Sequence, residues 1–122
     1  MIALLHHLGL VLLGGVFHWA GVEHFLRFRA IAASMAEQGI ARPRLLLAAG
    51  SVLEIGAGLC LALGVGVPYA AAALAVFTIA ATLMLLDFWR HSGEAREALR
   101  NGFAINVAVL GGLMVAAATG LR

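Results

Sequence analysis

Four stretches of the chain are apolar for long enough to cross a lipid bilayer. A hydrocarbon core about 30 Å thick needs roughly 20 apolar residues per helix. Stretches of about that length occupy residues 2–26, 45–66, 68–89 and 103–121. Of the 122 residues, 63% are hydrophobic and 11% are charged, which leaves too little polar surface for a soluble domain of this size. We therefore predict an all-α membrane protein, a single domain over residues 1–122 folded as a bundle of four transmembrane helices.

The connections between these stretches differ in character. In residues 27–44, apolar side chains recur at helical spacing between flanking arginines, which predicts a short amphipathic helix in the membrane interface, ended by Gly39. In residues 90–102, Ser92 is a candidate N-cap and the pair Asn101-Gly102 a candidate stop, which predicts a second short interfacial helix. The uncharged link around Pro68 predicts a tight antiparallel hairpin of the second and third spans.

Positive charge is concentrated in two of the three connections. Seven of the eight arginines lie in the first and third connections, the remaining one is Arg122, and lysine is absent. By the positive-inside rule both connections are predicted to lie in the cytoplasm, with both termini on the periplasmic side of a bacterial inner membrane. Arginines in such positions indicate topology and contacts with anionic membrane lipids. No basic and aromatic stripe of the kind that binds nucleic acid is present, so we expect no nucleic-acid partner.

Glu54 lies in the middle of the second apolar stretch, where an ionisable side chain is rare unless it has a function or a partner. The surrounding Gly56, Gly58 and Gly64 are expected to let neighbouring helices approach closely, so Glu54 is predicted to face the bundle interior. Two interpretations stay open. The carboxyl is either a neutral structural group hydrogen-bonded to His18 or to a backbone carbonyl, or part of a functional site.

Polar side chains from all four helices are predicted to gather in the cytoplasmic half of the membrane. With a rise of ~1.5 Å per residue, His18, Glu54 and Thr82 are expected at similar depth. Such clustering favours a cavity that opens toward the cytoplasm. Each member also has a structural interpretation: His18 as a packing histidine, His24 as a half-solvated interfacial group, and Asp87 with Trp89 as an interfacial anchor. The residues nearer to the cytoplasm are Glu23, His24, Asp87 and Asn106.

Five sequence features in a characteristic order resemble the DoxX family of small four-helix membrane proteins. They are GVFHWAGVEHF, a turn with Gly39 and Pro43, LEIGAGLCLALG, DFW and NVAVLGG, which together cover essentially the whole chain. The turn GIARPR departs from the Gly-x-Pro-x-Pro turn that is frequent in the family.

The resemblance implies a redox context. One branch of the family resembles the small membrane subunit of thiosulfate:quinone oxidoreductase, and other members are associated with membrane redox complexes. A quinone is therefore the expected cofactor, with Glu54 and His18 as catalytic residues that donate hydrogen bonds or protons. The chain has no evident electron donor, so a redox partner protein or a bound cofactor would be needed, and whether the chain is itself an enzyme stays open. The expected ligand-binding residues are Glu23, His24, Thr82, Asp87, Trp89 and Asn106.

Three other classes of protein are alternatives to a redox subunit. A haem site needs histidines from facing helices, but all four intramembrane histidines lie in residues 2–26, so neither haem nor metal is expected unless a homo-oligomer brings two copies together. A small proton-coupled transporter also fits a single membrane glutamate but agrees less well with the strong charge bias of the loops. A non-catalytic assembly or scaffold subunit is supported by faces of small residues on the helices and ranks close behind the redox subunit.

Overall fold

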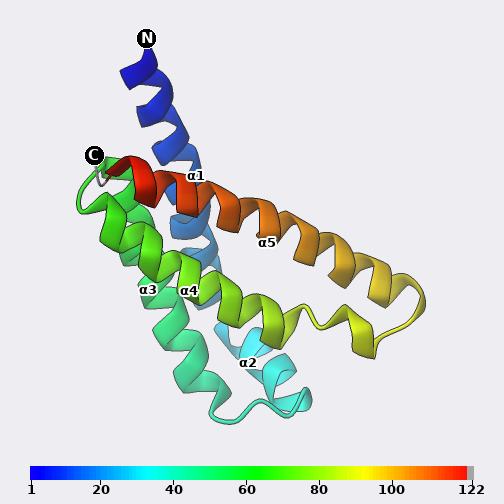
Figure 1. Ribbon diagram of the computed structural model, residues 1–122. Coiled ribbons are helices and arrows are strands. Elements are labelled where there is room, and N and C mark those ends of the chain that lie inside the picture. Colours follow the sequence, from blue (N-terminus) through cyan, green and yellow to red (C-terminus); the bar gives the residue numbers. More distant parts are fainter. Residues whose placement is uncertain (121–122) are drawn as a thin grey trace. The chain divides into compact units, whose positions relative to one another are not determined.

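The computed structural model of the protein describes residues 1–120 as helices joined by short connections, with no strand in that range (Figure 1). Four helical segments are long and apolar enough to cross a membrane, so the predicted all-α class with four membrane-length helices is confirmed. The chain divides into two compact units, Met1–Gly66 and Val67–Arg122, and each is described by itself. That the four helices form one bundle stays a prediction. The helices are α1 (Ile2–Leu26), α2 (Phe28–Glu37), α3 (Pro43–Leu63), α4 (Val67–Leu85), the 3-10 helix η1 (Phe88–Arg90) and α5 (Gly93–Gly120).

Glycines bring the backbones of α1 and α3 into direct contact in the first unit. A Cβ atom on Gly58 of α3 would lie 2.7 Å from the carbonyl oxygen of Gly14 and 2.7 Å from the backbone nitrogen of His18. A Cβ atom on Gly21 of α1 would lie 2.7 Å from the carbonyl oxygen of Ser51. Real Cβ atoms do not approach other atoms so closely, so these positions admit only glycine at this helix separation. Small residues at helix contacts of this kind are typical of packing within membranes.

Only one of the three glycines predicted to support close approach does so. Gly58 lies in the contact, whereas a Cβ atom on Gly56 would meet no atom within 4 Å. Gly64 has a different role, because it ends α3 in the left-handed conformation at φ 75°. Glycine adopts this conformation without the steric penalty that a Cβ atom brings. The prediction for Gly56 and Gly64 is therefore wrong, because facing the neighbour depends on the rotation of α3 about its axis.

The first connection contains the predicted short helix, α2. The apolar residues Ala32 and Met35 on one side of α2 are buried, and the helix contacts both α3 and α1. Beyond its last residue, Gly39 adopts a positive φ of 83°, which agrees with the predicted end. The position of α2 in a membrane interface stays a prediction.

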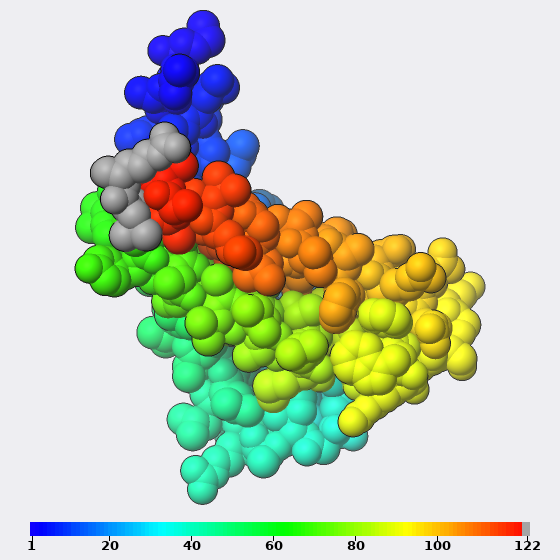
Figure 2. Space-filling model, viewed as in Figure 1, coloured from blue at the N-terminus to red at the C-terminus, as the bar shows by residue number. Residues whose placement is uncertain are grey.

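In the second unit, α4 and α5 lie side by side (Figure 1). The buried residues of α4 form a stripe that includes Leu74, Thr78 and Thr82. Near the other end of the pair, a Cβ atom on Gly120 would lie 3.0 Å from Cδ of Pro68. Helix α5 buries only Leu113 and Ala116, and its outer surface, orange to red, is visible along the helix in Figure 2. Within the second unit, α4 therefore covers only a small part of the surface of α5.

Two expected helix boundaries differ from the structure. Helix α5 runs without a break from Gly93 to Gly120, so the predicted stop at Asn101-Gly102 and the separate second short helix are wrong. Asn and Gly cost about 0.5 to 1 kcal/mol each inside a helix, too little to end one that has begun and continues into an apolar segment. In the third predicted span, residues 68–89, helix α4 ends already at Leu85 and η1 follows at Phe88–Arg90, although the whole segment Val67–Arg90 is long and apolar enough to cross a membrane. The predicted end of the last span, residue 121, lies outside the described residues.

Candidate functional site

The buried carboxyl of Glu54 is paired with His24. Helix α3 turns Glu54 to its buried side, where the residue is only 4% exposed. Oε1 of Glu54 lies 2.8 Å from Nδ1 of His24 on α1, and the His24 side chain is 34% exposed. Among residues 1–120 the expected partners of Glu54, His18 or a backbone carbonyl, do not bond to its carboxyl, and His24 does so instead. The pair thus joins a buried acid to an imidazole that reaches the edge of the unit.

His18 has a different partner on the same helix. Its Nδ1 lies 3.0 Å from the carbonyl oxygen of Ile55. Because a carbonyl oxygen can only accept, Nδ1 must carry the proton and donate it. In the neutral ring, Nε2 is then the acceptor, and its orientation is set by the bond on the other side of the ring.

Local sequence explains why these side chains converge. His18, Gly21 and His24 follow one another at intervals of three residues along one side of α1. The absent side chain of Gly21 leaves room for Glu54, since a Cβ atom there would lie 3.0 Å from Cβ of Glu54. One turn before Glu54, the hydroxyl of Ser51 is buried and has no hydrogen-bond partner among residues 1–120. We call His18, His24, Ser51 and Glu54 the His–Glu cluster.

Glu23, a predicted ligand-binding residue, forms an ion pair outside the His–Glu cluster. Its Oε1 lies 3.7 Å from Nη1 of Arg27, one turn later on the same side of the chain. The Glu23 side chain is 48% exposed and that of Arg27 is 68% exposed. An exposed pair of this kind contributes little to stability, typically ~0.2–1 kcal/mol.

Thr82 and Asn106 meet in the second unit. Thr82 Oγ1 donates a hydrogen bond to the carbonyl oxygen of Thr78 at 2.5 Å, and Nδ2 of Asn106 donates to Thr82 Oγ1 at 2.9 Å. The hydroxyl of Thr78 is buried without a hydrogen-bond partner among residues 1–120. This contact joins α4 to α5 within the apolar part of both helices.

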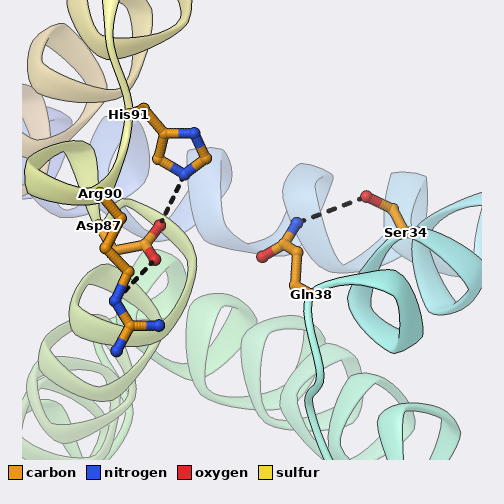
Figure 3. Close-up of polar contacts among 5 residues, drawn as sticks. All are labelled: Ser34, Gln38, Asp87, Arg90 and His91. Atoms are coloured by element: carbon orange, nitrogen blue, oxygen red, sulfur yellow. Dashed lines mark hydrogen bonds and ion pairs between the residues drawn. The ribbon is translucent and has the colours of Figure 1, made fainter.

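Asp87 and Trp89 lie in the connection between α4 and α5. Oδ2 of Asp87 lies 3.9 Å from Nε of Arg90, and Oδ1 lies 3.5 Å from Nε2 of His91. Figure 3 draws both contacts as dashed lines. The Trp89 ring makes edge contacts with Phe88 at 5.4 Å and Phe103 at 6.3 Å between ring centroids. Aromatic rings beside charged residues are typical of membrane–water boundaries.

Figure 3 also draws a hydrogen bond in the first unit. The side-chain amide of Gln38, the C-cap of α2, donates it to the hydroxyl of Ser34.

A protein-family model described as DoxX matches residues 7–87, which is most of the chain. The chain belongs to the DoxX family. No curated protein and no solved structure matches it. The matched range includes the whole His–Glu cluster of this DoxX protein, together with Glu23, Thr82 and Asp87, whereas Trp89 and Asn106 follow it.

The structure of this DoxX protein distributes the predicted site residues over both units. Glu54, His18, His24 and Glu23 belong to the first unit, and Thr82, Asp87, Trp89 and Asn106 to the second. One cavity shared by both groups stays a prediction, and so do their catalytic and ligand-binding roles. Within residues 1–120, no three His, Cys, Asp or Glu side chains are grouped as a metal ion would require.

Sequence reasoning missed the hydroxyls of Ser51 and Thr78. Each lies one helical turn before a residue that the sequence did single out, Glu54 in one case and Thr82 in the other. Spacing of i, i+3 or i+4 was the available signal, since such residues share a helix face. Small hydroxyl residues are common in apolar helices, so the signal carries little weight alone.

Proposed function

We propose that this DoxX protein is a membrane subunit of a quinone-linked redox system, with the His–Glu cluster as its proton-handling site. The observation that carries the proposal is the buried Glu54 carboxyl, held 2.8 Å from an imidazole that is itself partly exposed. Ionisable groups inside membrane helices are costly, and proton relays are among their recurrent uses. A histidine linked to a buried acid has the chemistry to pass protons between the acid and the outside.

The cluster has hydrogen-bonding groups that suit a quinone headgroup. Quinone oxygens need donors in the oxidised form and acceptors in the reduced form. Nε2 of His24 is a donor when Nδ1 accepts a hydrogen bond from a protonated Glu54 carboxyl, and also when the ring is fully protonated. Nε2 of neutral His18 is an acceptor, because Nδ1 donates to Ile55. His24 and His18 together therefore offer one hydrogen-bond donor and one acceptor.

Each residue then has a distinct task in the proposal. A quinone, when bound, supplies two-electron chemistry that takes up or releases two protons. His24 would hold one quinone carbonyl oxygen and would exchange a proton with Glu54, whose buried carboxyl keeps that proton away from water. His18 orients a hydroxyl through Nε2. Electrons enter from a redox partner protein, since the His–Glu cluster contains no redox-active group.

The proposal includes a placement in the bacterial inner membrane. Both arginine-bearing connections lie in the cytoplasm, both termini lie outside, and α2 rests in the interface beside anionic lipids. This placement is supported by the distribution of seven of the eight arginines over two connections. Four helices of membrane length make the chain a multi-pass membrane protein in either orientation.

Quinone content of the purified protein tests the proposal. Wild type, His24→Ala and a control, Glu94→Gln on the exposed first turn of α5, are purified in lipid nanodiscs. Solvent extracts are then analysed by mass spectrometry. We expect stoichiometric quinone in wild type and control, and a several-fold loss in His24→Ala with unchanged helix content by circular dichroism. Equal quinone content in all three proteins, or none in wild type, would overturn the proposal.

A non-catalytic assembly subunit is the second candidate. It is favoured by two observations: α1 and α3 are locked by backbone contacts at Gly14 and Gly58, and α5 buries only Leu113 and Ala116. A subunit of this type would use α5 to contact a larger membrane protein. Absence of quinone together with co-purification of one stoichiometric partner, lost on substitution of exposed α5 residues, would favour this function.

A further inference from the structure

A pocket of about 130 Å³ lies between α4 and α5, wholly within the second unit. Its walls are mostly apolar and include Ile79, Phe103 and Leu110, while Thr78, Thr82 and Asn106 provide the polar atoms. For comparison, an apolar protein cavity of ~150 Å³ is known to bind benzene, so this space suits one six-membered ring.

The hydrogen bonds beside the pocket leave the side-chain oxygen of Asn106 without a donor. The Thr82 hydroxyl proton is used by the carbonyl oxygen of Thr78, so Thr82 can only accept from Asn106. Asn106 must then present Nδ2 to Thr82, which fixes the orientation of its side-chain amide. Its Oδ1 is left without a hydrogen-bond partner among residues 1–120. The buried hydroxyl of Thr78 has none in that range either. An acceptor that lacks a donor in an apolar setting is unfavourable.

We propose that this pocket binds a small aromatic alcohol, with the ring beside Phe103 and the hydroxyl donating to Oδ1 of Asn106. A lipid acyl chain fills apolar space but leaves that oxygen without a donor. A buried water molecule needs about two to four polar partners. The walls of this pocket are mostly apolar and favour an aromatic ring over water. The proposal does not rest on the proposed redox function, whose residues belong to the first unit.

Binding of 4-fluorophenol to the protein in nanodiscs, followed by fluorine NMR, tests the proposal. Empty nanodiscs correct for partitioning into lipid, and displacement by unlabelled phenol identifies the saturable component. The matched ligand is 4-fluoroanisole, which has a similar ring but no hydroxyl to donate. We expect saturable binding of the phenol and about tenfold weaker binding of the anisole, as for the loss of one hydrogen bond to a half-buried side chain.

Three variants distinguish the contribution of the hydrogen bond to binding from that of the pocket volume. Asn106→Leu removes the acceptor at similar size and should weaken phenol binding about tenfold while leaving anisole binding unchanged. Ile79→Phe fills the pocket and should abolish binding of both ligands. Val76→Phe, one turn earlier on α4 and 69% exposed, lies outside the pocket lining and should bind like wild type. Equal affinity for both ligands, binding that survives Ile79→Phe, or no saturable binding would each overturn the proposal.

Discussion

The pairing of Glu54 with His24 decides how an acidic residue is accommodated in a membrane-length helix. A carboxyl transferred from water to an apolar setting needs a hydrogen-bond partner, or its burial is strongly unfavourable. His24 provides that partner at 2.8 Å, and its side chain is 34% exposed, so the pair is not sealed from its surroundings. Glu54 is buried and His24 is partly exposed, so the pair is a better candidate for proton transfer than either residue alone.

Substitutions at the pair should separate loss of the acid from loss of the hydrogen bond. Glu54→Gln keeps an atom that can bond to Nδ1 of His24, so we expect the free energy of unfolding to change by less than about 1 kcal/mol. His24→Ala leaves a buried carboxyl without that partner and should cost about 1–3 kcal/mol. Equilibrium unfolding in mixed detergent–SDS micelles measures both.

The control for this pair is His91→Ala in the exposed connection, which should shift the free energy of unfolding by less than about 0.5 kcal/mol. If Glu54→Gln unfolds the protein and Glu54→Asp rescues it, then Glu54 is a charged structural partner and the functional interpretation loses its main support.

At the level of elements, the contact of α1 with α3 depends on missing side chains. Gly58→Ala places a methyl group 2.7 Å from backbone atoms of α1 that cannot move independently of their helix. We expect a cost of about 1–3 kcal/mol or more, because the helices must separate. Gly56→Ala, two residues earlier with no atom within 4 Å, should instead be neutral or stabilise by up to ~1 kcal/mol. The same unfolding assay compares them, and similar effects at both positions would contradict the described rotation of α3.

The continuity of α5 through Gly102 can be tested by the sign of a substitution. In a continuous helix Gly102→Ala should stabilise by up to ~1 kcal/mol, because alanine is the better helix former. The added Cβ atom would lie 3.4 Å from Cδ2 of Leu86, a contact that a small shift of that side chain relieves. If Gly102 ended a helix in the left-handed conformation, alanine there would be unfavourable.

Gly64 serves as the matched control for Gly102. It ends α3 at φ 75°, so Gly64→Ala should destabilise the protein by about 1 kcal/mol. Opposite signs for the two substitutions support the single long helix, whereas destabilisation by both would restore a break at residues 101–102.

At the scale of the whole molecule, the distribution of arginine predicts its orientation. Alkaline phosphatase is active only outside the cytoplasm, so a fusion after Gly66 or Arg122 should be active and one after Ser92 inactive. Gly66 lies in the uncharged turn between α3 and α4, and Ser92 in the arginine-bearing connection. Immunoblots establish that all fusions are expressed. The reverse pattern would contradict both the topology and a cavity that opens toward the cytoplasm.

The sequence by itself determined the all-α class, the four membrane-length helices and the prominence of Glu54, because hydropathy and length are properties of contiguous residues. The limits of α1 were predictable to the residue for the same reason. The tertiary structure decided that His24 and not His18 pairs with Glu54, and that Gly58 and not Gly56 contacts α1. These choices depend on the rotation and axial shift of α3 against α1. Since one helical turn is only about 5.4 Å, a shift of that size exchanges one partner for the next, and no local pattern encodes it.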